Sequence, residues 1–362
     1  AAADRFTAEK LAAGEKQFSY KMVDPSVGPQ VMTVTMKQDG EQAIEVMGKV
    51  VPARVYLSTA SVMPDMQGVE YVDEHGRMLR STIDLMPGMS MQLLAADASI
   101  AQAKMDPPEM MASMLVKPDR PIDRPRTRRQ AVYEIDIPRR AGDDADMTVI
   151  RSFGAQRVEW IEDGLARVTV DLDDPVVDER DMPGEAELAA SVMIDSKDPR
   201  VLALVDQALG DAGDAMAAGD KAERLRRFVI DYVQTKDFGV GQATATEVAQ
   251  TRQGDCTEHA VLLAAMLRAS GIPARTVIGM VYVDRFAGQR GAFGYHMWNQ
   301  AWLDGRWVDL DATLGPDTPF DAAHIAFAPA NLGEQELYTD LARVAPLMGG
   351  FTIRVVSVDG VR

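Results

Sequence analysis

The sequence contains a single cysteine, Cys256, in the stretch Arg-Gln-Gly-Asp-Cys-Thr-Glu-His-Ala. Because one cysteine cannot form an internal disulfide, Cys256 is a buried apolar side chain, a metal ligand or a nucleophile. It falls in the first turn of a helix predicted for residues 256–270, where unpaired backbone amides and the helix dipole favour negative charge. The nucleophilic form of cysteine is the thiolate. The position of Cys256 alone leaves two roles equally open, a nucleophile and a buried apolar side chain.

A cysteine nucleophile needs a base, and the base needs a group that orients it. The chain has four histidines that could be this base. His259 follows Cys256 by three residues and faces the buried side of the same predicted helix, so a structural role is expected for it. His75 lies in a predicted turn of another domain, and His324 follows an irregular stretch with no obvious strand to hold it. His296 instead opens a predicted strand.

The strand that begins at His296 has a predicted hairpin partner. A turn at Asp304-Gly305 separates the two strands. In such a hairpin the start of the first strand lies opposite the end of the second, and side chains alternate between two faces. His296 is therefore expected to face Asp309 or Asp311, which both point to the same side. Alternation alone does not choose between these carboxylates.

Four segments carry these residues: Gly254-Asp255-Cys256-Thr257-Glu258-His259-Ala260, the helix end from Arg268 to Arg275, His296-Met297-Trp298, and Gly305-Arg306-Trp307 through Asp311-Ala312-Thr313. Together they resemble the core of the transglutaminase-like superfamily. The cysteine, the histidine and the aspartate occur in the family's order, each in a matching context. The resemblance covers about residues 185–330 and offers nothing for residues 1–180.

This resemblance implies a papain-like α+β core, in which a helix bearing the cysteine packs on an antiparallel sheet bearing the histidine and the aspartate. Carried over, it assigns Cys256 as the nucleophile, His296 as base and acid, and Asp311 as the orienting carboxylate. In the family a Pro-Thr or similar pair follows the aspartate. Here Ala312 replaces the proline and Thr313 is kept. This context favours Asp311 over the other carboxylate.

Three further residues are candidates for the site. Gln250 precedes Cys256 by six residues, a spacing reminiscent of papain-like enzymes, and could donate to an oxyanion beside the Cys256 backbone amide. Tyr295 and Trp298, near His296 along the strand, are candidates for the substrate cleft. One thiolate and scattered histidines lack the spacing of a zinc site, so neither a metal nor another cofactor is expected.

The chemistry that the resemblance implies is cysteine-dependent acyl transfer at an amide bond through a thioester intermediate. The favoured reaction is hydrolysis of a peptide or related amide, as by a protease, with a peptide or protein as substrate. Two alternatives stay open. The protein could be a protein-glutamine transglutaminase that transfers acyl groups to amines, or a non-catalytic binding or assembly protein that retains the fold.

Composition restricts the partners and the location. The formal net charge of −17 repels phosphate backbones and anionic lipid surfaces, so nucleic acid is not an expected partner. No apolar run approaches the ~20 residues that a membrane-spanning helix needs. The sequence starts Ala-Ala-Ala-Asp without Met, and small residues at a mature N-terminus fit signal-peptide removal. We therefore expect an exported protein, periplasmic or secreted.

A chain of 362 residues is long for one hydrophobic core, so at least two domains are expected. Residues 1–185 show the alternation typical of strands, and could form two subdomains separated near residues 117–129. That proline- and arginine-rich segment is interpreted as a solvated connector, with an anion-docking strip as the alternative. Residues 186–362 are expected to form the transglutaminase-like catalytic domain, which ends with a C-terminal helix and strand.

The elements expected to position the site follow from apolar periodicity and punctuation. They are helices 220–237 and 256–270 and strands 275–283, 295–303, 306–310 and 351–358. The second helix is apolar on nearly all sides from Ala260 to Leu267, so it should be the buried central helix.

In the N-terminal region, short helices are expected at residues 95–104 and 108–115. The methionine-rich segments between Met63 and Met114 are interpreted as packing, with a peptide groove or Cu(I) binding as alternatives.

Overall fold

The computed structural model describes residues 2–22, 31–61, 63–86, 89–96, 115–137, 150–235, 243–286, 288–332 and 350–359. The chain forms two compact units, Ala1–Met105 and Asp106–Arg362. Helices occur together with antiparallel sheets, which confirms the predicted α+β class. Within these ranges, no helix combines the length and the apolar character needed to cross a membrane.

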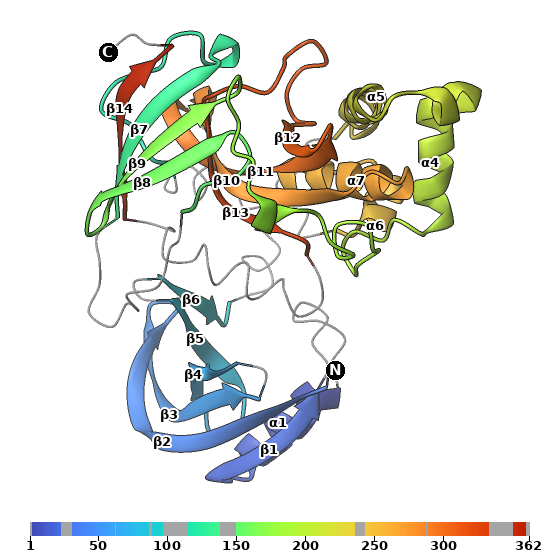
Figure 1. The fold of residues 1–362 in the computed structure, drawn as a ribbon. Helices are drawn as coiled ribbons and strands as arrows, with labels where there is room; N and C mark the ends of the chain where they lie inside the picture. The colour runs from blue at the N-terminus through green and yellow to red at the C-terminus, as the bar shows by residue number, and fades with distance from the viewer. Residues whose placement is uncertain are drawn as a thin grey trace. The chain divides into compact units, whose positions relative to one another are not determined.

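In the part of the chain that the structure describes, the first unit contains helix α1 and a six-stranded antiparallel sheet, in which each strand pairs with the next along the chain (Figure 1). Its elements are α1 Ala2–Ala12, β1 Gln17–Met22, β2 Met32–Val46, β3 Lys49–Ala60, β4 Met63–Val72, β5 Met78–Met86 and β6 Met89–Leu94. At the predicted turn between β4 and β5, the Asp73 carboxylate accepts hydrogen bonds from the amides of His75 and Arg77. The core of this unit is a single small cluster of buried residues, formed by Leu11, Phe18, Met36, Tyr56 and Val72.

The second unit contains two four-stranded antiparallel sheets, with strand orders β12-β11-β10-β13 and β14-β7-β9-β8. The strands are β7 Gln130–Asp136, β8 Gln156–Glu162, β9 Leu165–Asp171, β10 Ala274–Phe286, β11 Gln289–Leu303, β12 Arg306–Leu310, β13 His324–Ala330 and β14 Thr352–Val358. The helices are η1 Pro125–Thr127, η2 Glu179–Asp181, α4 Pro199–Leu209, η3 Gly210–Ala215, α5 Ala218–Tyr232, α6 Ala245–Thr251 and α7 Cys256–Ala269. In Figure 1 the sheet that contains β10 and β11 lies between the helices and the other sheet.

Helix α7 is the centre of the helical layer. Every residue from Glu258 to Arg268 is buried, as the apolar run predicted. The Asn299 amide of β11 donates to the Ala260 carbonyl at 2.8 Å, which fastens the helix to the sheet. The predicted helix 220–237 is observed as α5 but ends earlier, because the backbone becomes extended at Val233 (φ −84°, ψ 91°).

Strands β10 and β11 each contribute to two hydrophobic cores. Ala274 and Leu303, at one end of the strand pair, pack with the helices. Tyr282 and Phe293, at the other end, pack with β7, β9 and β14. These two strands therefore connect the helical layer to the second sheet and cross the middle of the unit.

Residues 115–129, which we call the arginine strap, are buried at Pro118, Ile122 and Pro125 and exposed at most of their other positions, whereas a solvated connector was the interpretation for residues 117–129. Ile122 is only 3% exposed. Arg120 donates to two carbonyls of β14 at 3.0 and 2.9 Å. Arg126 donates to the buried Asp321 carboxylate at 2.7 Å. Arg120 and Arg126 thus satisfy acceptors that are distant in sequence.

The two units divide after Met105, whereas the sequence suggested a boundary near residue 185. Strands β7, β8 and β9 belong to the second unit because β7 pairs with β14 from the other end of the chain. The acidic stretch 171–187 is also anchored there. Its Asp181 forms two hydrogen bonds of 2.7 Å with Arg275 in β10.

Several expectations fall outside the described residues. The predicted helices 95–104 and 108–115 lie almost entirely there, and the expected C-terminal helix does so if it occupies residues 333–349. The last predicted strand, 351–358, is observed as β14. The methionine side chains of the segments between Met63 and Met114 are likewise not described.

Candidate active site

Cys256 is the first residue of α7 and is partly exposed. The Asp255 carboxylate accepts the Thr257 amide at 2.9 Å, and the Glu258 carboxylate accepts the amides of Asp255 at 2.9 Å and Ala243 at 3.1 Å. Asp255 and Glu258 thus form a capping box that ties the preceding loop to the helix. Glu258 is 1% exposed, and burial raises the pKa of its carboxyl. These bonds fix the position of the cysteine.

Gly254 is needed where the chain turns into α7. Its φ is +150°. A Cβ at this position would lie 2.2 Å from the Cβ of Glu258. Any other residue would therefore combine an unfavourable backbone conformation with a collision against the buried cap.

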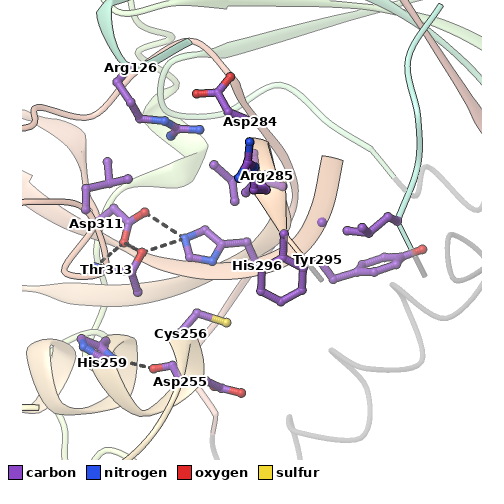
Figure 2. Close-up of a pocket in the computed structure, with 16 residues that line it drawn as sticks. Arg126, Asp255, Cys256, His259, Asp284, Arg285, Tyr295, His296, Asp311 and Thr313 are labelled. Atoms are coloured by element: carbon purple, nitrogen blue, oxygen red, sulfur yellow. Dashed lines mark hydrogen bonds and ion pairs between the residues drawn. The ribbon is translucent and has the colours of Figure 1, made fainter. Parts of the chain in front are cut away.

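His296, in β11, lies against Asp311, which follows β12 (Figure 2). The distance from His296 Nε2 to Asp311 Oδ2 is 2.8 Å, and the side chains are 7% and 1% exposed. Strands β11 and β12 pair with Gln300 opposite Asp309. Alternation along this hairpin places Asp311 on the same side as His296.

The two aspartates have different partners. Asp309 Oδ1 accepts the indole N–H of Trp298 and the amide of Gln300, both at 2.9 Å. Asp311 Oδ1 accepts the backbone amide and the hydroxyl of Thr313, both at 2.7 Å, which directs Oδ2 toward His296. The structure therefore brings Asp311, and not Asp309, to the histidine.

The pKa of His296 depends on both of its neighbours, Asp311 and Cys256. Burial lowers the pKa of its imidazole, but the charge and hydrogen bond of Asp311, with a smaller contribution from Cys256, raise it to about 10. Burial likewise opposes ionisation of Asp311, but the charge of His296 and its hydrogen bond hold the pKa of this carboxyl well below its usual value. An imidazolium–carboxylate pair is therefore favoured at neutral pH.

A cavity of about 570 Å³ opens beside these side chains, a volume in the range of sites for small ligands. Cys256, His296 and Asp311 contribute to its wall, and Figure 2 shows Cys256 next to the imidazole. Apolar side chains, among them Val281, Phe286 and Leu314, line part of the remaining wall. Arg126, Asp284 and Arg285 add charged groups.

The other predicted residues are placed as follows. Tyr295 lines the cavity, as expected of a cleft residue. Trp298 is 1% exposed and packs on Phe153 and Val277. Gln250 is exposed on α6 and is not among the lining residues.

Two of the remaining histidines match the sequence interpretation. His75 lies in the β4–β5 turn of the first unit, as expected. His259 is 2% exposed, and its Nδ1 is 2.5 Å from the Asp255 carbonyl, which fits the structural role that the sequence suggested, although it also lines the cavity.

His324 is the residue that sequence reasoning missed. It is the first residue of β13 and is 2% exposed. Its Nε2 lies 3.3 Å from Asp311 Oδ2, and its Nδ1 lies 3.2 Å from Asp321 Oδ1. The local signal was the Asp-x-x-His spacing. The pairing of β13 with β10, which brings His324 near Asp311, has no local signal.

His296, Asp311 and His324 also form a group whose ligand atoms lie within 4.8 Å of one another, close enough to hold a metal ion. In the described structure these atoms hydrogen-bond to one another. The geometry is accounted for by hydrogen bonds.

Residues 205–312 match the model of the transglutaminase-like superfamily. The matched segment contains Cys256, His296 and Asp311 and confirms the resemblance seen in the sequence. The matched segment also contains α7 and the strands β10, β11 and β12. No curated protein shows significant sequence similarity to the chain.

Solved structures with a similar fold include a provisionally assigned cysteine protease from Cytophaga hutchinsonii. It has 16% identity and a TM-score of 0.38, over 64% of this chain and 89% of that chain. The periplasmic domain of TgpA from Pseudomonas aeruginosa has 17% identity and a TM-score of 0.36, over 57% and 91% of the respective chains. Red sea bream transglutaminase has 13% identity and a TM-score of 0.25, over 53% and 47%.

Proposed function

We propose that the second unit is a cysteine-dependent enzyme that hydrolyses peptide or related amide bonds. The observation that carries this proposal is the arrangement of His296, whose Nε2 is held by Asp311 and whose ring adjoins Cys256 at the wall of the cavity. A nucleophile, a base and an orienting carboxylate in this order are what acyl transfer requires. The proposed catalytic residues are therefore Cys256, His296 and Asp311.

In the proposed reaction, the Cys256 thiolate attacks the carbonyl carbon of a bound amide. The C–S bond forms, the C–N bond breaks, and the His296 imidazolium gives its proton to the leaving amine. Water then attacks the thioester while neutral His296 accepts its proton, which releases the acid and regenerates the thiolate. Asp311 stabilises the imidazolium and keeps its ring oriented.

The oxyanion of each tetrahedral intermediate needs hydrogen-bond donors. The Cys256 amide is suitable because it is at the first position of α7, where backbone amides have no intrahelical acceptor. Gln250 was the candidate for a second donor. Its exposed position on α6, away from the cavity lining, gives that role no support. The proposal therefore assigns only the cysteine amide.

The test uses an unbiased peptide mixture and a labelled amine, with Cys256→Ala and His296→Gln as the inactive variants and His75→Gln as the matched histidine control. We expect new peptide termini with the native protein and the control, and a loss of at least ~10³-fold in both inactive variants. Labelled glutamines instead of new termini would establish the transglutaminase alternative. Identical results for native protein and Cys256→Ala in both assays would refute catalysis and favour a binding role. The exported location stays a prediction, testable by cell fractionation.

A further inference from the structure

We infer that His324 is a positioning residue that holds Asp311 in place for His296, and that Asp321 and Arg126 in turn hold His324. These four residues and His296 form what we call the ion-pair network. The inference rests on the proposed function, because it assigns a role to the surroundings of the proposed catalytic residues.

His324 has an acceptor at each ring nitrogen. Nε2 is 3.3 Å from Asp311 Oδ2, and Nδ1 is 3.2 Å from Asp321 Oδ1 and 3.1 Å from the Asp321 carbonyl. Ionised carboxylates and carbonyls only accept hydrogen bonds, so both ring nitrogens must donate and His324 is an imidazolium. In agreement, although burial lowers it, the charges and hydrogen bonds of Asp321 and Asp311 raise the pKa of this histidine.

Neighbouring rings prevent His324 from turning away. Its ring centroid is 4.2 Å from that of Phe320 and 5.3 Å from that of Trp298, and the Trp298 contact is edge-on. The backbone of His324 pairs with Val281 of β10. A histidine fixed in this way presents Nε2 to Asp311 at one position.

Asp321 is fixed from two further directions. Its Oδ2 accepts Arg126 at 2.7 Å, and its Oδ1 accepts the Ala323 amide at 2.9 Å as well as His324. Arg126 also donates to the Tyr282 carbonyl of β10. The charges therefore alternate along the ion-pair network, from Arg126 through Asp321, His324 and Asp311 to His296. Such pairing is what allows these charges to be buried.

The consequence concerns the orientation of Asp311. Its Oδ1 is held by Thr313, and its Oδ2 is shared between His296 at 2.8 Å and His324 at 3.3 Å. With His324 in place, both carboxylate oxygens are fixed. Without it, Oδ2 is free to move from the plane of the His296 ring, and the support of the His296 imidazolium weakens.

The test needs no substrate, because the chain has only one cysteine and iodoacetamide labelling therefore reports on Cys256 alone. When a thiolate is paired with an imidazolium, its alkylation rate rises a second time as the imidazolium loses its proton. For His296 that rise is expected near pH 10. In His324→Phe it should lie at least ~1 pH unit lower than in His324→Gln, because both variants remove the charge of His324 and only the glutamine can still donate to Asp311. A second rise in His324→Phe at or above that of His324→Gln would overturn the inference.

His324→Gln separates position from charge. The Gln side-chain amide can donate to Asp311 but is neutral. Because loss of the like charge of His324 favours the His296 imidazolium, we expect the second rise at or above its native pH. If His324→Gln instead behaves like His324→Phe, the hydrogen bond to Asp311 is not what matters and the assignment is wrong. Tryptophan fluorescence of the folded variants checks that the site is intact.

Arg126→Met tests the far end of the ion-pair network without changing the buried histidine. We expect a smaller shift, also toward lower pH. Arg124→Met, on the same strap, is the matched control, because Arg124 contacts Asp123 at the surface and should leave the profile unchanged. An unchanged profile in Arg126→Met would remove Arg126 from the network. If the native protein shows no second rise at all, the proposed function itself fails; if only the difference between His324→Phe and His324→Gln is absent, the inference alone fails.

Discussion

The two units use opposite ways of building a sheet. In the first unit every strand pairs with its neighbour in sequence, and five residues form its buried cluster. In the second unit β7 pairs with β14, β10 pairs with β13, and buried residues form larger cores. The second unit pairs strands that are distant in sequence, and this pairing can bring distant polar side chains together.

The two units also differ in the partners of their buried charged side chains. Among the described residues of the first unit, the most buried carboxylate is Glu70, whose neighbour Ser58 donates to it at 3.1 Å. In the second unit, buried Arg275 is paired with Asp181 from a remote segment, and buried His296 is paired with Asp311. Because unpaired buried charge is costly, these pairs have to be assembled by the fold, and the proposed catalytic residues use one of them.

The largest effect that this comparison predicts concerns two aspartates at the end of one hairpin. Asp311→Asn should lower kcat about 10³-fold to 10⁴-fold, as expected when a catalytic histidine loses its orienting carboxylate. Asp309→Asn should lose less than about tenfold, because an Asn oxygen can still accept from Trp298 and Gln300. Peptide cleavage rates of the two variants provide the measurement. Equal losses would contradict the assignment of Asp311.

The second prediction compares one glycine from each unit. Gly254 and Gly40 have φ values of +150° and +159°. An added Cβ at Gly254 collides with Glu258, but at Gly40 it meets nothing within 4 Å. Gly254→Ala should therefore lower the free energy of unfolding by roughly 3 kcal/mol and Gly40→Ala by about 1 kcal/mol.

The sequence offers a way to measure the two units separately. All four tryptophans, at positions 160, 298, 302 and 307, are in the second unit. Denaturant unfolding followed by tryptophan fluorescence reports on Gly254→Ala, and far-ultraviolet circular dichroism reports on Gly40→Ala. If both alanines cost the same, crowding at Glu258 contributes nothing and the strain is in the backbone alone.

The third prediction is a smaller, graded effect of pH. Because the pKa of His296 is raised to about 10 in the folded protein, its contribution to stability is complete below the ordinary histidine pKa of about 6.5 and is lost as pH rises toward 10. The slope for one proton is at most ~1.4 kcal/mol per pH unit. Tryptophan-detected unfolding should show this loss in the native protein and not in His296→Gln.

The stability of the first unit should depend on pH in a different range. Burial raises the pKa of Glu70 above its usual value, although Ser81 and Ser58 oppose the shift. Its contribution to stability is therefore complete below the ordinary Glu pKa and is lost as pH rises through the raised value. Glu70→Gln should remove this dependence from the first unit and leave the tryptophan signal unchanged. A change in the tryptophan signal would show that the units do not unfold separately.

The parts of the fold that depend on local pattern were predictable from the sequence. The predicted helix 256–270 is observed as Cys256–Ala269, and the predicted strand 306–310 has the same bounds as β12. The His296 hairpin was predictable because its turn and alternation lie within a few residues. The choice of Asp311 came from the family resemblance and agrees with the hydrogen bonds of Thr313.

The rest depended on contacts between distant residues. His324 looked unsupported because the strand that holds it pairs with β10, which precedes it by several dozen residues. The arginine strap looked solvated because its acceptors are far away in sequence. Arg126 and Asp321 are separated by 195 positions, and Arg120 and Val355 by 235. A local pattern of prolines and arginines does not contain these partners.

The same separations in sequence determine the order in which these hydrogen-bond partners are synthesised. At ~5–20 residues per second of synthesis, Arg126 is made roughly 10–40 s before Asp321. The interval is longer for Arg120, because its acceptor is the Val355 carbonyl of β14. Cys256 is likewise made before His296, Asp311, Asp321 and His324. The proposed catalytic residues therefore cannot take up the described arrangement until β13 has been synthesised.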